Sequence, residues 1–592
     1  MCGISGELRF DGELAEPQLV ARMTEHLAPR GPDGAGVWSS GSAALGHRRL
    51  AIIDLSRKGD QPMVDPELGL TIVFNGCIYN HKELRRELEA CGYRFFSSSD
   101  TEVVLKAFHC WGDKFLDRLS GMFAFCIVER DSGKAVLARD RLGIKPLYLA
   151  EHPGSLRFAS TLPALTSIGD VDCTVDPVAL HHYLTFHAVV PAPRTILTGV
   201  TKLPPATMLE VEPDGRRRQV RYWEPSHRAD GALTCDSPEE WFEAVADCLR
   251  LAVERRLVAD VPVGVLLSGG LDSSLIVGLL RERGQDDLST FSIGFDTLGE
   301  EEGDEFRWSD VVAERFETDH HRIRVPTDDV LAALQPTVAA MSEPMVSHDV
   351  VAFFLLSREV SKHVKVVQSG QGADEVFAGY HWYQKLGDAA GDGVDEYASL
   401  FFDRDHRAVT EAVNPEFLPG TDVSREFVAE HFARAGAGTP VERALRLDAH
   451  VMLVEDPVKR VDNTTMAWGL EARVPFLDHE LVELAAACPS ELKLAQDGKG
   501  ILKDLGRKVI PSEIVDRPKG YFPVPPLIHL EAPYVDLLRE ALVSPAARDR
   551  ALFRPEHVSH VLDHPNELTT LRYNKLWELG VLELWLQTHD IA

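Results

Sequence analysis

The pattern of apolar and polar positions divides the chain into a β-rich first part and an alternating second part. In the first 200 or so residues, an apolar run at 70–74 ends in the turn-forming pair Asn75-Gly76. Apolar runs at 122–128 and 135–138 flank a polar turn and predict a β-hairpin. Apolar residues at helical spacing predict helices over 82–91 and 101–111.

The second part of the chain alternates strand-like and helix-like segments. Strands are expected at 261–267, 290–295 and 364–368, with helices over 273–283 and 308–316. This alternation predicts a parallel sheet with helices on both faces. Residues 380–445 are polar and weakly patterned, as in an insertion, and the chain beyond them is expected to be mostly helical.

Composition narrows the class of protein. The 592 residues carry a net charge of −30, which disfavours nucleic acid as a partner. The longest apolar run, at 350–356, is far shorter than the roughly 20 residues of a membrane span. The N-terminus lacks the features of a secretory signal, and the nine cysteines include no Cys-x-x-Cys pair. We therefore expect a cytoplasmic protein without a membrane partner or a structural zinc site.

Four residues of the first part have the chemistry to act on an amino acid. Removal of the initiator methionine would give Cys2 a free α-amine, and an amine of pKa about 8 can serve as general base for the adjacent thiol. Arg49 suits a carboxylate and Asp100 an ammonium group. Asn75, with a backbone N–H, suits an oxyanion. A cysteine at position 2 is by itself weak evidence of function, and the case rests on its neighbours.

Two loops of the second part suit a polyphosphate. The predicted strand at 261–267 leads into Ser268-Gly-Gly-Leu-Asp-Ser-Ser274 and then a helix, so backbone and hydroxyl donors would face an anion. Asp272 beside phosphate makes sense mainly as a Mg²⁺ ligand, and Asp374 in the loop 369–375 is a plausible second ligand. The loop lacks the Gly-Lys-Ser/Thr of a Walker A motif.

The N-terminal motifs resemble the class II glutamine amidotransferase domain. The resemblance covers roughly residues 2–210 and rests on five motifs that occur in order: Cys2-Gly-Ile4, Arg30 to Gly34, His47 to Asp54, Phe74 to Asn80 and Ser99 to Glu102. It implies that Cys2 attacks the side-chain amide of glutamine and that Asn75 and Gly76 form the oxyanion hole. Glutamine would be bound by Arg49, Ile52, Asn75 and Asp100. The products would be glutamate and ammonia.

The second part resembles the PP-loop ATP pyrophosphatases, and the whole chain resembles the glutamine-hydrolysing asparagine synthetase family. The segments Leu470 to Asp478 and Lys499 to Leu502 also match this family. The resemblance implies that Asp272 and Asp374 hold Mg²⁺, that Lys499 stabilises charge near the α-phosphate and that Gln371 faces the incoming ammonia. The implied ATP-binding residues are Leu266, Ser268, Gly269, Gly270, Asp272, Ser273, Ser274, Ile293, Ser369 and Gly370.

The expected architecture follows from the two resemblances. An α+β N-terminal-nucleophile sandwich over 2–215 is followed by a linker over 216–236 and an α/β PP-loop domain over 237–592 with a helical C-terminal part. The implied reaction hydrolyses glutamine, passes ammonia through the interior and converts an acceptor carboxylate, activated as an acyl-adenylate, into an amide. The partners would be small molecules, with ATP as co-substrate and Mg²⁺ as cofactor, in a possible homodimer.

Several departures from the family pattern bear on the acceptor. Cys77 stands where the family has a glutamate that helps to hold the glutamine ammonium, and we interpret Cys77 as a small buried filler. Gln371 stands where the family has a glutamate, and it can orient ammonia but cannot accept a proton. The segments 343–349 and 462–466 also differ from the aspartate-using pattern. The chain looks most like relatives that amidate the osmoprotectant dipeptide N-acetylglutaminylglutamine.

Other interpretations stay open. An asparagine synthetase that uses aspartate is the main alternative, and other amides or a β-lactam ring closure are further acceptor reactions. A glutaminase with a decayed second domain, or a nucleotide and amino-acid sensor without turnover, would be a different class of protein. The intact loop 268–274, Asp374 and Lys499 oppose the glutaminase interpretation, and the intact Cys2 and Arg49 oppose the sensor interpretation. A phosphoribosyl transferase should lack the loop 268–274.

Overall fold

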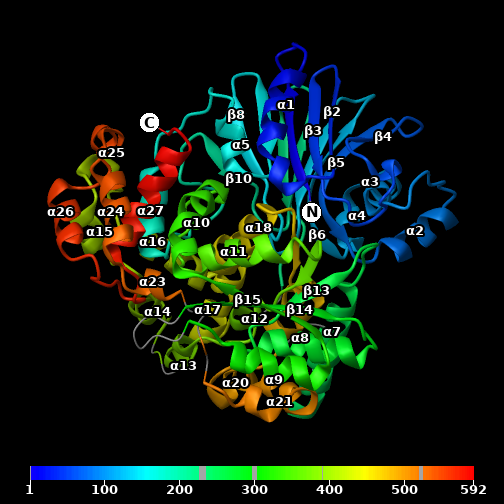
Figure 1. The fold of residues 1–592 in the computed structure, drawn as a ribbon. Helices are drawn as coiled ribbons and strands as arrows, with labels where there is room; N and C mark the ends of the chain where they lie inside the picture. The colour runs from blue at the N-terminus through cyan, green and yellow to red at the C-terminus, as the bar shows by residue number, and fades with distance from the viewer. Residues whose placement is uncertain are drawn as a thin grey trace.

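The N-terminal domain is built on two six-stranded sheets that pack face to face (Figure 1). The computed structural model of the chain describes residues 2–225, 235–296, 303–387, 389, 391–518, 520 and 524–591. The strand orders are β10-β8-β9-β1-β3-β2 and β12-β11-β7-β6-β5-β4, and neighbouring strands are antiparallel. The strands are β1 (Gly3–Arg9), β2 (Gly34–Ser40), β3 (Ala43–Arg49), β4 (Met63–Asp65), β5 (Leu70–Ile78), β6 (Gly121–Glu129), β7 (Ala135–Arg139), β8 (Tyr148–His152), β9 (Ser155–Ala159), β10 (Val200–Lys202), β11 (Thr207–Val211) and β12 (Arg217–Arg221).

Apolar side chains from both sheets form the middle layer of this domain. Ile4 and Leu45 come from the first sheet and Val73 and Leu137 from the second. Helices α1 and α5 cover the outer face of the first sheet, and α2, α3 and α4 cover that of the second. The result is the expected N-terminal-nucleophile sandwich. The helices are α1 (Pro17–His26), α2 (His81–Ala90), α3 (Asp100–Trp111), α4 (Phe115–Arg118), α5 (Leu162–Thr166) and α6 (Pro177–Thr185).

The predicted hairpin and helices of this domain are confirmed, but the predicted turn at Asn75-Gly76 is wrong. Strand β5 continues through both residues to Ile78. Gly76 lies opposite Phe123 in β6, and an added Cβ would stand 2.2 Å from the carbonyl oxygen of Met122. Glycine is therefore needed here for a close approach of two strands and not for a turn.

The C-terminal domain contains a five-stranded sheet in the order β15-β14-β13-β16-β17 (Figure 1). All neighbouring pairs are parallel, which confirms the predicted parallel sheet. The two edge strands were not predicted from the sequence. The strands are β13 (Val263–Leu266), β14 (Ser289–Phe295), β15 (Asp319–Val325), β16 (Val366–Gln368) and β17 (Glu471–Arg473).

Helices cover both faces of the parallel sheet. Helices α7, α8 and α21 share one apolar cluster with β13, and α10, α11 and α27 share another with β14. Helix α9 packs against α8 and β14, and the other helices follow β16 in the chain. The helices are α7 (Pro238–Arg255), α8 (Leu271–Glu282), α9 (Phe306–Phe316), α10 (Thr327–Ala340), α11 (Asp349–Val360), α12 (Ala373–Val376), α13 (His381–Gly387), α14 (Val394–Phe401), α15 (His406–Ala412), α16 (Val423–Ala433), α17 (Pro440–Leu447), α18 (Lys459–Met466), α19 (His479–Ala487), α20 (Ser490–Leu494), α21 (Gly500–Val509), α22 (Ser512–Val515), α23 (Pro525–Ile528), α24 (Ala532–Leu542), α25 (Pro545–Arg550), α26 (Pro555–Asp563) and α27 (Lys575–Thr588).

The weakly patterned segment 380–445 folds into helices α13 to α17 where it is described. Two π-helical turns over 448–458 connect α17 to α18. The hydroxyl groups of Tyr383 and Tyr397 donate to the buried Asp448, at 2.5 and 2.6 Å. These partners are distant in sequence, which explains why the local pattern looks weak.

The segment expected to be a linker begins inside the first domain. Strand β12 pairs with β11, so part of 216–236 belongs to the N-terminal sheet. Residues 226–234 of the expected linker lie outside the described residues. In the described part of the chain, no helix has both the length and the apolar character that crossing a membrane requires.

Candidate active sites

The first pocket lies in the N-terminal domain around Cys2. This residue precedes β1 and is 7% exposed, and burial raises the pKa of its thiol. The backbone nitrogen of Cys2 donates to Asn75 Oδ1 at 3.0 Å. Asn75 Nδ2 is buried and has no hydrogen-bond partner among the described residues. A buried amide donor beside the thiol is therefore available to an oxyanion.

Most of the predicted glutamine-binding residues meet in this pocket. Cys2, Arg49, Ile52, Gly76 and Asp100 all line it. Asn75 is not among the lining residues and reaches the site through Cys2.

Arg49 and Asp100 are both held in place by neighbouring groups. Arg49 Nη1 pairs with Asp60 Oδ1 at 2.7 Å. The Ile78 N–H donates to Asp100 Oδ2 at 3.0 Å, and burial raises the Asp100 pKa.

Cys77 also lines the first pocket. It is 1% exposed, so the prediction of a small buried side chain is confirmed, although its position at the pocket wall was not expected. Burial raises the pKa of its thiol to about 12. The thiol is therefore neutral at pH 7 and offers no charge to a substrate.

The C-terminal domain closes the first pocket. Glu471 and Arg473 of β17 are among its lining residues. Both side chains are buried, and Arg473 Nε donates to Glu471 Oε1 at 2.6 Å. Sequence analysis placed these residues in a family motif but gave them no role. The only local indication of a role was that two charged residues stand within an otherwise apolar segment.

A buried contact between the domains supports the position of Cys2. Arg30 Nε donates to the carbonyl oxygen of Cys2 at 3.2 Å. The same guanidinium group binds Asp462 of α18, with Nη1 2.8 Å from Oδ2 and Nη2 3.3 Å from Oδ1. The Arg30 and Asp462 side chains are 5% and 3% exposed. The backbone of Cys2 is thus tied to the C-terminal domain through one arginine.

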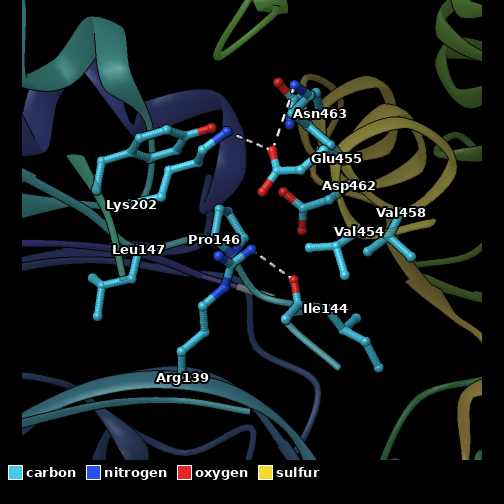
Figure 2. Close-up of a pocket in the computed structure, with 13 residues that line it drawn as sticks. Arg139, Ile144, Pro146, Leu147, Lys202, Val454, Glu455, Val458, Asp462 and Asn463 are labelled. Carbon is cyan, nitrogen blue, oxygen red and sulfur yellow. Dashed lines mark hydrogen bonds and ion pairs between the residues drawn. The ribbon is translucent and has the colours of Figure 1, made fainter. Parts of the chain in front are cut away.

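A cavity of about 10 Å³ lies beside this contact, between the two domains. Figure 2 shows Arg139 and Lys202 on the N-terminal side and Glu455, Asp462 and Asn463 on the helix of the C-terminal side. Lys202 Nζ donates to Glu455 Oε2 at 2.6 Å. The volume is close to the least that holds one water-sized molecule.

The second pocket lies at the carboxyl ends of β13, β14 and β16 and has a volume of about 350 Å³. Its lining includes the predicted residues Leu266, Ser268, Gly270, Asp272, Ser273, Ile293, Ser369, Gly370, Gln371, Asp374 and Lys499. Two predicted residues do not line it. Ser274 is fully buried in α8, and Gly269 turns the loop with φ +71°.

Gly269 is fixed by its close packing against α9. An added Cβ would lie 2.4 Å from the backbone nitrogen of Ser309. The second pocket opens at the carboxyl ends of the strands, which is where open parallel sheets usually bind their ligands.

Three charged groups meet on one side of the second pocket. Lys499 Nζ lies 2.7 Å from Asp272 Oδ2 and 2.9 Å from Asp374 Oδ1. Burial acts to lower the Lys499 pKa, but the two carboxylates raise it above its ordinary value. Gly379 permits this approach, because an added Cβ would lie 2.2 Å from Asp374 Oδ1. Two carboxylates that converge on one cation form a donor set that fits Mg²⁺.

Arg460 and two carboxylates form a second charged cluster at this pocket. Arg460 Nη1 lies 3.0 Å from Asp349 Oδ1 and 3.1 Å from Asp456 Oδ1. Arg460, Asp349 and Tyr380 line the pocket together with Gln371. None of the three was predicted as a site residue. Arg460 and Asp349 lie 111 positions apart by their residue numbers, so no local motif joins them.

Comparison with known proteins gives a family for each of the two domains. Residues 1–223 match the glutamine amidotransferase domain family and residues 244–587 the asparagine synthase family. Asparagine synthetase [glutamine-hydrolyzing] 3 of Bacillus subtilis is 32% identical over 547 residues, covering 88% of this chain and 87% of that protein. A putative asparagine synthetase [glutamine-hydrolyzing] of Mycobacterium tuberculosis is 32% identical over 651 residues, covering 98% of both chains. The chain belongs to the asparagine synthetase family.

Membership of the asparagine synthetase family fixes the class of reaction. The chain is a glutamine-hydrolysing amidoligase that uses ATP and small-molecule substrates. We call the first pocket the glutaminase pocket and the second the synthetase pocket. A solved structure of the glutamine phosphoribosylpyrophosphate amidotransferase from B. subtilis covers 56% of this chain and 92% of that chain, with 16% identity and a TM-score of 0.31.

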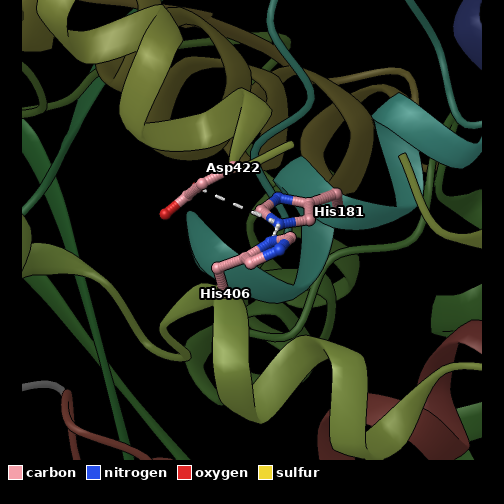
Figure 3. Close-up of side chains that lie close together, drawn as sticks. All are labelled: His181, His406 and Asp422. Carbon is pink, nitrogen blue, oxygen red and sulfur yellow. Dashed lines mark hydrogen bonds and ion pairs between the residues drawn. The ribbon is translucent and has the colours of Figure 1, made fainter. Parts of the chain in front are cut away.

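A histidine pair outside both pockets links the two domains of this asparagine synthetase relative (Figure 3). His181 Nε2 of α6 lies 2.9 Å from His406 Nδ1 and 4.0 Å from Asp422 Oδ1. The first distance is that of a hydrogen bond. Asp422 Oδ1 accepts from the Arg425 N–H and caps α16. The group is therefore accounted for as a hydrogen-bonded contact and a helix cap.

Proposed function

We propose that the chain transfers the amide nitrogen of glutamine to the carboxylate of N-acetylglutaminylglutamine and forms the dipeptide amide. The observation that supports the amidotransferase mechanism most is that one chain contains the glutaminase pocket with its thiol, the synthetase pocket with its phosphate-binding type of loop, and a buried interface between the two domains. The acceptor is inferred from the residues of the synthetase pocket.

In the glutaminase pocket, Cys2 is proposed as the nucleophile. Once the initiator methionine is removed, the Cys2 sulfur attacks the amide carbon of glutamine while the thiol proton passes to the freed Cys2 α-amine. Asn75 Nδ2 and the Gly76 N–H stabilise the oxyanion. The amine returns the proton to the leaving ammonia, and water then hydrolyses the thioester to glutamate. Arg49 binds the glutamine carboxylate and Asp100 its ammonium, with Ile52 along the pocket wall.

In the synthetase pocket, an oxygen of the acceptor carboxylate attacks the α-phosphorus of ATP and pyrophosphate leaves. The proposed phosphate donors are Ser268, Gly269, Gly270, Ser273, Ser274, Ser369 and Gly370. Leu266 and Ile293 flank the adenosine. Asp272 and Asp374 would hold Mg²⁺, which neutralises phosphate charge when bound. Lys499, already cationic beside them, stabilises the charge that develops at the α-phosphate.

Ammonia completes the reaction by attacking the acyl carbon, which releases AMP. We propose that it travels between the domains past the cavity beside Lys202 and Asp462. The cavity is the size of one small molecule, and buried charged pairs surround it. Gln371 in the synthetase pocket orients the incoming ammonia through its amide group.

The acceptor is inferred from the charges of the synthetase pocket. Gln371 stands where a carboxylate would be expected for a standard asparagine synthetase. Gln371 can orient the incoming ammonia but cannot accept a proton from it, so the pocket departs from the aspartate-using pattern. Arg460 is then a suitable partner for polar groups of the dipeptide.

One observation favours aspartate as a second candidate acceptor. Arg460 and Asp349 lie 3.0 Å apart in the pocket, and such a pair can bind the carboxylate and ammonium of an amino acid. The curated relatives named above are asparagine synthetases.

The two acceptors are distinguished by pyrophosphate release. Purified protein is incubated with glutamine, ATP and Mg²⁺ together with either aspartate or N-acetylglutaminylglutamine. Release with the dipeptide alone is the expected result. Release with aspartate alone would show that the acceptor proposal is wrong and leave the two-pocket mechanism in place.

We place the enzyme in the cytoplasm, in line with its nine free cysteines. Light scattering on the same preparation tests the possible homodimer.

A further inference from the structure

Strand β17 brings two charged side chains of one domain into the glutaminase pocket of the other. Glu471 and Arg473 are 1% and 0% exposed and line the pocket with Cys2 and Asp100. The strand pairs with β16 of the parallel sheet, and the Ser369 N–H donates to the Arg473 carbonyl oxygen at 2.8 Å. The backbone of β17 thus belongs to the synthetase domain while its side chains belong to the glutamine site.

The position of this charged pair is fixed by hydrogen bonds. Arg473 Nε donates to Glu471 Oε1 at 2.6 Å, and its Nη1 donates to the carbonyl oxygens of Arg256 and Val258, each at 2.8 Å. Arg473 therefore cannot swing away without breaking three contacts. Glu471 is held at the pocket wall by the same arrangement.

Glu471 and Asp100 differ in how firmly they hold a negative charge. Burial acts to raise the pKa of Glu471, but nearby positive charges, first that of the chain's N-terminus and then those of Arg473 and Lys145, lower it to about 2. Burial raises the pKa of Asp100. Of these two pocket carboxyls, Glu471 is the one whose surroundings favour the charged form.

The difference between Glu471 and Asp100 matters because residue 77 adds no charge to the pocket. A glutamate there would add a carboxylate to the pocket, but the Cys77 thiol is neutral at pH 7. The α-ammonium of glutamine needs acidic partners in a buried site, because an unpaired buried charge is strongly disfavoured. Glu471 supplies a carboxylate in the same pocket from the other domain.

We propose that Glu471 recognises the α-ammonium of glutamine together with Asp100, in place of the acidic residue that position 77 lacks. The proposal rests on the proposed hydrolysis of glutamine in this pocket. It makes the glutamine site a product of both domains, so that correct docking of β17 is required for tight binding. It also assigns Arg473 as the residue that positions Glu471.

The test compares two amides that differ only in the ammonium group. Glutamine and 4-carbamoylbutanoate, which lacks the α-amine, are hydrolysed by the wild type and by Glu471→Gln. Losing one charged hydrogen bond costs about 1.5–3 kcal/mol, so kcat/KM for glutamine should fall about 10- to 100-fold in the variant, mainly through KM. The value for 4-carbamoylbutanoate should change little. Ammonia-dependent pyrophosphate release should persist and shows that the variant is folded.

A rescue variant and a matched control sharpen the test. Adding Cys77→Glu to Glu471→Gln should restore part of the preference for glutamine. Glu7→Gln is the control, because Glu7 is equally buried and pairs with Arg157 at 3.1 Å, but it lies outside the pocket. It should leave the ratio of the two kcat/KM values unchanged.

The outcomes separate this inference from the proposed function. An equal loss for both amides in Glu471→Gln would overturn the role of Glu471 and indicate an effect on Cys2 instead. An unchanged KM for glutamine would overturn it as well. A wild type that hydrolyses neither amide would overturn the glutaminase mechanism itself and this inference with it.

Discussion

At the scale of single residues, the glutaminase pocket depends on the different surroundings of the two polar side-chain atoms of Asn75. Its Oδ1 accepts from the backbone nitrogen of Cys2, while Nδ2 has no partner in the described part of the chain. A buried donor without a partner is costly, so its retention beside a thiol is best explained by an anionic intermediate. In the proposed mechanism, the Asn75 amide therefore both positions Cys2 and donates to the oxyanion.

The first prediction concerns Asn75→Ala. Loss of one oxyanion donor typically lowers kcat about 10²- to 10³-fold, so glutamine hydrolysis should fall by this factor. Ammonia-dependent pyrophosphate release should stay near the wild-type rate. Asn80→Ala is the matched control, since the Asn80 amide contacts Arg118 and Ser120 and does not line the pocket. Similar losses in both variants would argue against the oxyanion role.

The second prediction concerns the buried Glu375 beside the Mg²⁺ candidates. Burial, and after it the charge of Asp374, raise the Glu375 pKa to about 7. The folded state therefore binds more protons than the unfolded state between about pH 4.5 and 7, and this group lowers stability as pH rises through that window. Glu375→Gln can still accept from the Tyr380 hydroxyl, which lies 2.7 Å away.

The Glu375→Gln variant should therefore gain thermal stability relative to the wild type as pH rises from about 5 to 7.5. Thermal unfolding midpoints of both proteins at pH 5.0, 6.0 and 7.5 check this. A difference that is constant with pH would show that Glu375 does not titrate in this range.

At the scale of elements, the long periodic segments were predictable and the short ones were not. The hairpin β6–β7 and helices α2 and α3 followed from local periodicity. Strand β17 has three residues and acquires its conformation only by pairing with β16. Its side chains contact the other domain, and no local pattern contains that information. The continuous strand β5 was misread because Gly76 serves a close approach and not a turn.

The third prediction concerns the loop that leads into α8. Gly269 has φ +71°, and an added Cβ would meet the backbone of α9 at 2.4 Å. Gly269→Ala should therefore displace the loop and lower ATP-dependent pyrophosphate release at least tenfold, while glutamine hydrolysis persists. Gly284→Ala is the control at the other end of α8, because it has φ +80° but no heavy atom within 4 Å of the added Cβ. It should lose only about 1 kcal/mol of stability and keep its activity.

At the scale of the whole molecule, most of the predicted residues line two pockets, and the interface between these pockets is the part that the sequence could not predict. Cys2, Arg49 and Asp100 each lie in a separate motif of the family, and these motifs made them predictable from the sequence. Asp462 lies 432 positions from Arg30, and only the packing of the two domains brings them together. Buried pairs of this kind leave no periodic trace, because each residue alone looks like an ordinary surface charge.

The last prediction concerns this buried pair. Asp462 neutralises Arg30, which donates to the Cys2 carbonyl oxygen, and also lies 3.4 Å from Lys145 Nζ. Removing one partner of a buried pair leaves an uncompensated charge and costs about 3–5 kcal/mol, less where a polar replacement keeps a hydrogen bond. Asp462→Asn should therefore loosen Cys2 and the domain interface together. Glutamine-dependent amide formation should fall about tenfold or more, and ammonia-dependent formation much less.

The ratio of glutamate to amide formed distinguishes a loosened interface from a damaged synthetase pocket. Ammonia that escapes between the domains would raise this ratio in Asp462→Asn above that of the wild type. Lys365→Ala is the matched control, since Lys365 and Asp33 also join the two domains at 2.8 Å but are 40% and 28% exposed. An exposed pair contributes at most about 1 kcal/mol, so this variant should keep the wild-type ratio. If amide formation from glutamine and from ammonia fell by the same factor in Asp462→Asn, the effect would lie in the synthetase pocket. This result would contradict a coupling through Arg30.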